Sequence, residues 1–201
     1  ASIIAQVENF AAKNEEDAAA LEKIKEQAER MNKLISEISE AAVVDNELVT
    51  QSREKFDLSN TITEIVDHYI DTNEYPEVNL NCDIQKNLVL LGLPERIGQV
   101  VVNLLDNAIS FSRPEGTINV QLHKKWRRKP LLVIEDSGPG VSEAGAERIF
   151  ERFYTSRSGS ASVDNASGLG LFICRQIVEA HGGTIAVGKS ALGGARFEVS
   201  F

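Results

Sequence analysis

Hydrophobic residues in the first quarter of the chain recur at the spacing of one helix face. Intervals of three and four residues alternate along a run made up of Leu21, Ile24, Ala28, Met31, Ile35, Ile38 and Ala42. This spacing gathers the side chains in one narrow apolar strip, as in the seam of a coiled coil. It also occurs earlier, at Ile3, Val7 and Phe10, and the polar segment 13–17 interrupts it. The pattern predicts two antiparallel helices, of which the first is short.

Each of these helices carries its own apolar strip. A hairpin of two helices cannot bury both strips by itself, so we predict that residues 1–45 pair with a second copy to form a four-helix bundle. The alternative is a hairpin that packs against its own chain.

After residue 50 the pattern changes to short strands that alternate with helices. We therefore predict a helical hairpin over 1–50 and a second domain over 51–201. The second domain should contain helices at 57–70, 93–112, 146–150 and 170–183 and strands at 77–82, 87–92, 117–123, 130–136, 184–190 and 195–201. Pro94 suits a first helical turn, and Gly182 and Gly183 suit a helix end. We expect an α+β fold, a two-layer α/β sandwich whose mixed, mostly antiparallel sheet has helices on one face.

The charge of the chain limits its partners. With a formal net charge of −9 and an isoelectric point near 4.9, the surface as a whole is unsuited to nucleic acid, whose binding requires the neutralisation of many phosphates. One basic cluster, HKKWRRK at 123–129, lies between two predicted strands. We interpret it as a solvated hairpin turn, with an interaction patch as the alternative.

Cysteine usage and hydropathy indicate the compartment. Cys82 and Cys174 lie far apart and lack the spacing of a disulfide framework or zinc site. Apolar runs such as VVVNLL are much shorter than the roughly 20 residues that cross a bilayer. We expect the chain to lie in the cytoplasm and to reach a membrane only through segments upstream of it.

The helix predicted at 93–112 carries polar residues beside its core face. Ile97, Val101, Leu104, Leu105 and Ala108 share an arc of about 100°, and Asn103, Asn107 and Ser110 form a separate stripe to one side. Asn is a mediocre helix former, and a buried amide without partners costs roughly 1–3 kcal/mol. The stripe is therefore either solvated or paired with a ligand.

Two glycine-rich turns offer further binding chemistry. In IEDSGPGV at 134–141, Asp136 ends a strand and can accept hydrogen bonds from an amine, while Gly138 and Gly140 allow close backbone approach. In SGLGLFI at 167–173, a turn enters a helix, whose free N–H groups favour phosphate. The polar segment 151–167 between them has the composition of a mobile lid. Taken singly, each turn has an ordinary structural explanation.

The order of these motifs resembles the catalytic, ATP-binding domain of sensor histidine kinases, which belongs to the GHKL, or Bergerat, fold shared with gyrase, mismatch-repair and heat-shock chaperone ATPases. NLLDNAISFS resembles the N box, DSGPGV the first glycine box, IFERFY the phenylalanine-rich box and SGLGLFICRQIVEAHGG the second glycine box. The resemblance covers about 55–201, and the segment 1–45 resembles most of the dimerisation hairpin that precedes such domains.

The resemblance implies a role for each motif. Asn107 would bind Mg²⁺ through its side-chain oxygen, with Asn103 beside it, because Mg²⁺ prefers oxygen ligands and bridges phosphates. Asp136 would accept the exocyclic amine of adenine, with Gly138 and Gly140 making room for the base.

The remaining motif residues would surround the phosphates. Gly168 and Gly170, with Leu169 between them, would present backbone N–H groups to the phosphates, and Phe150 and Phe153 would anchor the lid. Together these residues would supply the positioning and charge neutralisation that phosphoryl transfer needs.

The chain departs from the family pattern at three positions. Ser110 stands where the N box usually has Lys, and Thr155 stands where many members have Arg, so two phosphate-facing cations are absent. Arg157 is the best substitute and Arg152 a poorer one, with a solvated lid arginine as the alternative. Ala195 replaces a frequent hydroxyl residue.

The phosphoacceptor histidine of the family would lie immediately before residues like those at 1–4, and the chain begins at Ala1. His68, His123 and His181 are poor replacements, and we interpret His181 as a favourable charge at a helix C-terminus. We therefore expect a fragment of a longer sensor kinase, or a variant without its own acceptor, that does not phosphorylate itself.

The resemblance implies a homodimeric kinase core of a membrane-anchored bacterial sensor. It would bind ATP and Mg²⁺, transfer the γ-phosphoryl to a histidine, and pass it to an aspartate of a response regulator. One alternative is a non-catalytic ATP-sensing dimer. Another is an ATP-hydrolysing clamp, which needs a carboxylate to activate water where this chain has Asn103.

Overall fold

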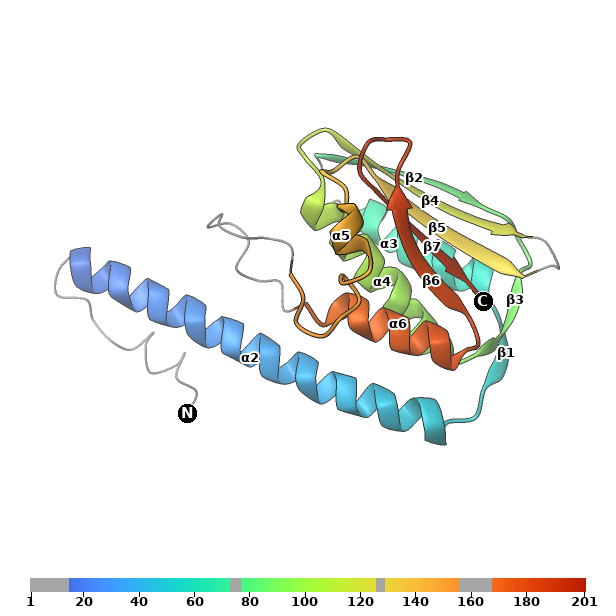
Figure 1. Ribbon diagram of the computed structural model, residues 1–201, viewed down its shortest axis with the longest axis horizontal. Coiled ribbons are helices and arrows are strands. Elements are labelled where there is room, and N and C mark those ends of the chain that lie inside the picture. Colours follow the sequence, from blue (N-terminus) through green and yellow to red (C-terminus); the bar gives the residue numbers. More distant parts are fainter. Residues whose placement is uncertain (1–14, 73–76, 126–128, 156–167) are drawn as a thin grey trace.

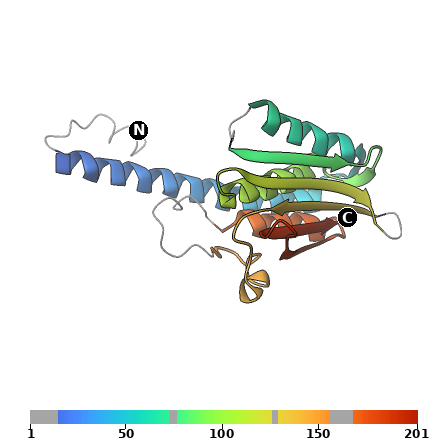
Figure 2. The ribbon, with the colours of Figure 1, turned by 90° about the horizontal axis from the view of Figure 1, so that it is seen from above.

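The computed structural model describes residues 15–72, 77–125, 129–155 and 168–201. Its longest helix, α2 (Glu15–Thr50), extends away from the rest of the molecule at its N-terminal end and lies beside α6 (Gly170–Ala180) at its C-terminal end (Figures 1 and 2). The first helix of the predicted hairpin lies outside the described residues. No described helix has the length and apolarity needed to cross a membrane.

The two ends of α2 differ in burial. Four residues of the apolar strip, Ile24, Met31, Ile35 and Ile38, are 49–59% exposed. Farther along, Val44 is fully buried and Leu48 packs against the core. Arg96 donates from Nε to Glu47 Oε2 at 2.7 Å, which ties this end of α2 to the following domain. The strip is thus uncovered along most of the helix.

Five strands form the main sheet. Their order is β2 (Val78–Ile84), β4 (Gly116–Lys124), β5 (Pro130–Asp136), β7 (Ala195–Ser200) and β6 (Thr184–Lys189). Among the strands of the described residues only the β2–β4 pair is parallel, and β4 and β5 form the predicted hairpin around the basic cluster. Residues 126–128 of that cluster lie outside the described part of the chain. A separate antiparallel pair joins β1 (Glu54–Asp57) to β3 (Val89–Gly92).

Helices cover one face of the sheet. α3 (Leu58–Thr72) contacts β2, α4 (Pro94–Phe111) contacts β5, and α6 contacts β6 (Figure 1). Burial alternates along β4, where Ile118, Val120 and Leu122 are shielded from solvent and the residues between them are half-buried. The predicted mixed, mostly antiparallel α/β fold is therefore confirmed.

One predicted helix is displaced. The pattern placed it at 146–150, whereas α5 spans Glu143–Ala146 and a turn follows it. The Ser142 side chain accepts the Gly145 N–H and caps the helix start. The cap therefore decides the position of this short helix.

The core face predicted for α4 is confirmed. Its apolar residues are fully buried, and they pack against the sheet together with Ile118, Ile134 and Phe197. Val100, which was not included in that face, is also buried, because α6 packs beside α4. This burial fixes the rotation of α4, and it leaves Asn103 and Asn107 half-buried at the edge of the core.

The prediction that His181 carries a charge at the C-terminus of α6 is wrong. His181 Nδ1 donates to the Ile177 carbonyl at 2.7 Å, and Nε2 accepts the Leu93 N–H at 3.0 Å, so the ring is neutral. Burial lowers the pKa of His181 and nearby Arg53 lowers it further, which outweighs the opposite effect of the Ile177 bond. Arg53 instead supplies the cation, since its guanidinium donates to the Ala180 carbonyl.

The neutral state of His181 predicts a loss of stability in acid. The pKa in the folded chain lies below the ordinary value of 6.5, so the stability due to the neutral ring is complete above pH 6.5 and is lost as the pH falls through the folded-state pKa. His181→Phe should lower stability at pH 8 by about 1–2 kcal/mol and should flatten the decline toward pH 5. Urea unfolding at both pH values measures this, with exposed His68→Phe as the control. Equal pH dependence in the parent chain and His181→Phe would contradict the assignment.

Candidate functional site

Asp136 ends β5 as a buried carboxylate that its neighbours orient. Its Oδ1 accepts the Gly138 N–H at 2.8 Å and the Ala195 N–H at 3.1 Å. Burial raises the pKa of Asp136, and these two hydrogen bonds oppose that shift. Within the described residues Oδ2 has no protein donor, so it can accept a hydrogen bond from a ligand.

The turn after Asp136 depends on glycine at close approaches. A Cβ at Gly138 would lie 2.6 Å from the carbonyl oxygen of Phe111, the last residue of α4. A Cβ at Gly194 would lie 2.1 Å from Asp136 Oδ1. The turn therefore fits between the end of α4 and the start of β7 only where side chains are absent.

The second glycine turn leads into α6. Gly168 has a φ of +71°, and its carbonyl accepts the Phe153 N–H at 3.1 Å. Leu169 is 2% exposed and anchors the turn in the core, and α6 begins at Gly170. A helix start presents N–H groups that lack partners within the helix, and it carries a partial positive charge. This end of α6 can therefore bind an anion.

The C-terminal half of α4 brings the two turns together. Asn103 Nδ2 lies 3.4 Å from the Gly170 carbonyl, and Phe111 contacts Gly138. The two contacts are about 12 Å apart along the helix axis, from the rise of about 1.5 Å per residue. Half-buried Asn107 lies midway between them, one turn from each. Asn107 and the contacts of both glycine turns thus lie along one stretch of a single helix.

The two aromatic residues of the phenylalanine-rich box differ in their contacts. Phe150 is buried and meets Phe197 edge to face, with ring centroids 6.5 Å apart. Phe153 has a φ of +62° and is 57% exposed as a residue, and its backbone N–H makes the contact with the second glycine turn. Arg152 places its guanidinium 4.5 Å from the ring centroid of Phe172. Arg157 lies outside the described residues.

The donor groups fit magnesium only together with a phosphate ligand. No group of three or more His, Cys, Asp or Glu side chains that could hold a metal occurs in the described parts of the chain. Mg²⁺ commonly takes one or two oxygen ligands from the protein and the rest from phosphates and water. The side-chain oxygen of Asn107 has the chemistry that such a ligand needs.

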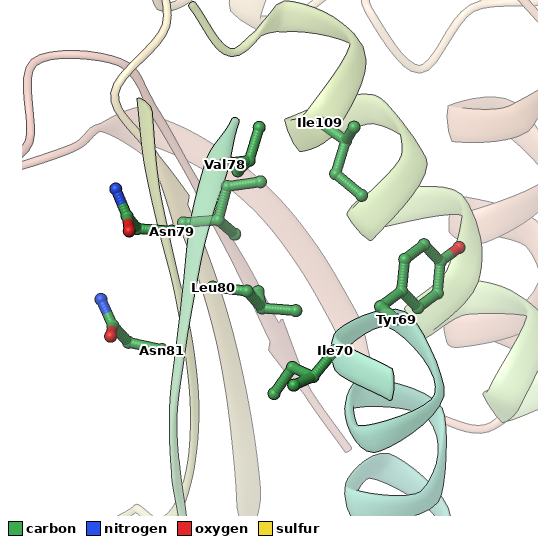
Figure 3. A pocket seen from close by; sticks show the side chains of 8 residues that line it. Tyr69, Ile70, Val78, Asn79, Leu80, Asn81 and Ile109 are labelled. Carbon is green, nitrogen blue, oxygen red and sulfur yellow. The ribbon is translucent and has the colours of Figure 1, made fainter. Parts of the chain in front are cut away.

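A pocket of about 210 Å³ lies elsewhere, between α3, β2 and α4 (Figure 3). Val78 and Leu80 point from β2 toward the helices, whereas Asn79 and Asn81 point to the other side of the strand. None of the predicted site residues lines this pocket. The candidate site is therefore the stretch of α4 between the two glycine turns.

Sequence reasoning missed two backbone contributions to this site. Gly194 lies so close to Asp136 that a side chain there would collide with it, and the Ala195 N–H donates to Asp136 Oδ1. Ala195 was considered only for the hydroxyl that it lacks. The adjacent glycines at 193 and 194, directly before a strand, were the available signal.

The model of the histidine kinase-, DNA gyrase B- and HSP90-like ATPase family matches residues 92–201, more than half of the chain. The chain belongs to this family. The match includes both glycine turns and α4.

The curated proteins that resemble this chain include sensor proteins. The sensor protein ChvG of Rhizobium meliloti (strain 1021) is 37% identical over 94% of this chain and 35% of its own length. The sensor protein SrrB of Staphylococcus aureus (strain MRSA252) is 28% identical over 93% of this chain and 32% of its own length. The chain thus spans about a third of the length of these curated relatives.

Solved structures show the same fold. The mycobacterial sensor histidine kinase MprB superposes with a TM-score of 0.64 at 27% identity, over 74% of this chain and 96% of that chain. Full-length ShkA, solved in complex with AMPPNP, superposes with a TM-score of 0.73 over 99% of this chain and 41% of that chain. Its identity of 20% supports the fold alone.

Gly194→Ala should disrupt the setting of Asp136. The added Cβ collides with Asp136 Oδ1, so we expect a loss of about 1–3 kcal/mol of unfolding free energy, as for overpacked sites. Gly188→Ala is the matched control, because a Cβ there meets nothing within 4 Å. Denaturant unfolding measures both variants. Equal stability of the two would mean that this close approach is not a constraint.

Proposed function

We propose that the chain binds ATP with Mg²⁺ along the C-terminal half of α4 and is the kinase core of a sensor histidine kinase. The observation that supports this most strongly is the meeting of both glycine turns with α4, at Phe111 and Asn103, on either side of Asn107. Residues 51–201 would form the nucleotide-binding domain, and 1–50 would belong to the dimerisation domain.

Each group has a specific task in this proposal. Asp136 Oδ2 accepts a hydrogen bond from the exocyclic amine of adenine, while its Oδ1 accepts the N–H groups of Gly138 and Ala195. Gly140 gives the base room beside this carboxylate. Together the orientation and burial of Asp136 favour a ligand that donates a hydrogen bond at this point.

The phosphate end uses backbone and amide groups. The turn from Gly168 to Gly170, with buried Leu169 between them, directs N–H groups and the α6 dipole at the phosphates. Asn107 would supply an oxygen to Mg²⁺, and Asn103, whose Nδ2 lies 3.4 Å from the Gly170 carbonyl, lies one helical turn away. Bound Mg-ATP supplies the transferable phosphoryl group and the cation that neutralises its charge.

The polar groups present favour an acceptor other than water. Asn103 cannot take a proton, which disfavours water activation and hence hydrolysis at this position. We propose transfer of the γ-phosphoryl to a histidine supplied by an acceptor helix, and then to an aspartate of a response regulator. Arg157 is the candidate cation near the γ-phosphate, whereas Arg152 faces the Phe172 ring.

We further propose that residues 1–45 form a homodimer within the cytoplasmic part of a membrane-anchored sensor. The exposed apolar strip of α2 supports this, because a second copy would cover it. Ile35→Glu should shift the chain toward monomer in sedimentation velocity, since Ile35 lies in the strip and is 58% exposed. Exposed Val89→Glu, on β3, is the control. A dimer unaffected by Ile35→Glu would place the interface elsewhere.

Asn107→Ala tests the metal ligand. The variant should retain its fold, because Asn107 lies off the buried face, and should lose about 10–100-fold in Mg-dependent affinity for a non-hydrolysable ATP analogue. Calorimetric titrations with Mg²⁺ and with EDTA separate this loss from nucleotide binding alone. Exposed Asn79→Ala, on β2, is the matched control. An unchanged titration for Asn107→Ala would remove that residue from the site.

Transfer can be tested with ATP labelled at the γ-phosphate. We expect no label on this chain alone, and label on a supplied helical hairpin that contains the acceptor histidine. Label on the chain itself would show that the acceptor has been misplaced. Tight nucleotide binding without any transfer would favour an ATP-sensing module. Such a module is the second candidate, because Ser110 and Thr155 stand where the family has phosphate-facing cations.

A further inference from the structure

The helices α4 and α6 lie side by side in opposite directions. Three of the polar contacts between them mark their pairing. At one end Leu93 meets His181, in the middle Val100 meets Cys174, and at the other end Asn103 meets Gly170. Residue numbers rise along α4 as they fall along α6. The last of these contacts lies within the candidate nucleotide site, and the first lies at the far end of both helices.

The three contacts differ in strength. The Cys174 thiol is a weak donor, and its Sγ lies 3.8 Å from the Val100 carbonyl oxygen. The amide of Asn103 lies 3.4 Å from the Gly170 carbonyl, which is long for a hydrogen bond. The bond from Leu93 N–H to His181 Nε2 is 3.0 Å, within the normal range. Of these, the His181 bond therefore resists sliding of one helix along the other most strongly.

The surroundings of His181 hold its ring in one orientation. Nδ1 donates to the Ile177 carbonyl at 2.7 Å, which fixes the tautomer and leaves a lone pair on Nε2 for Leu93. Gly92 lies against the ring, where a Cβ would come within 2.7 Å of Cδ2. Leu93 is the N-cap of α4 and has no side-chain cap, and Pro94 after it has no N–H. His181 thus binds the N-cap residue of α4.

We propose that His181 is a positioning residue for nucleotide binding, because it fixes the axial position of α4 relative to α6. The inference rests on the proposed function. Asn107 lies on one of these helices and the turn from Gly168 to Gly170 starts the other, so an axial shift changes the distance between them. Helices transmit such a shift along their length, and binding groups must hold their geometry to within about 0.5 Å.

Two substitutions at His181 test this role in the full chain. His181→Phe keeps a ring and removes both hydrogen bonds, and it should weaken binding of Mg-AMPPNP about tenfold. His181→Gln keeps an acceptor that can reach the Leu93 N–H, and it should restore affinity to within about threefold of the parent chain. Exposed His68→Phe should bind as the parent chain does.

A destabilised control separates positioning from general stability. Ile177→Val removes a methylene group from the same helix and leaves the His181 bonds in place, so it should lower the unfolding midpoint and leave affinity unchanged. Far-ultraviolet circular dichroism and thermal unfolding of every variant accompany the binding data. Equal losses of affinity in Ile177→Val and His181→Phe would overturn the inference.

Gly92→Ala provides a second route that retains His181. Its Cβ should displace the ring and weaken Mg-AMPPNP binding, whereas in a His181→Ala background the same change should have little further effect. Additive effects of the two substitutions would contradict the inference. Absence of Mg-AMPPNP binding by the parent chain would overturn the proposed function and this inference together, whereas unchanged binding by folded His181→Phe would overturn the inference alone.

Discussion

The burial of one face of α4 sets the position of the whole candidate site. The apolar residues of this face, from Ile97 to Ala108, are shielded from solvent between α6 and the sheet, and each buried Val, Leu or Ile side chain among them contributes about 1.5–3 kcal/mol relative to exposure. Rotation of α4 about its axis by about 100°, the angle between successive residues, would expose part of this face. The polar stripe with Asn103 and Asn107 therefore has one available direction, at the edge of the core between the two glycine turns.

Close backbone packing supplies the second constraint. Gly138 meets the end of α4, Gly168 meets the backbone of Tyr154, and Gly194 meets Asp136, each at a distance that no side chain allows. The approaches at Gly138 and Gly194 allow the N–H groups of Gly138 and Ala195 to reach the Asp136 carboxylate, which can remain buried because they satisfy its Oδ1. The site thus consists largely of backbone groups held by glycines, with few side chains specific to it.

Local patterns predicted much of the fold and part of the site. Helical periodicity located α4 and α6, strand alternation located the β4–β5 hairpin, and Asp136 was placed correctly at a strand end. Errors arose where a distant contact or a cap decides the outcome. The Ser142 cap makes α5 begin earlier in the chain than predicted. The burial of His181 against Gly92 and Leu93 makes its ring neutral. The bond between Ala195 and Asp136 joins segments that no local spacing connects.

The central claim is that the asparagine pair, Asp136 and both glycine turns bind one nucleotide. Titration of the ¹⁵N-labelled chain with Mg-AMPPNP, followed by amide resonances, tests it most directly. The account predicts that the backbone signals of Gly138, Gly168 and Gly170 and the side-chain signal of Asn107 change together with a single dissociation constant, while those of Val78 and Leu80 in the separate pocket stay constant. Changes confined to that pocket, or to only one of the two glycine turns, would contradict the account.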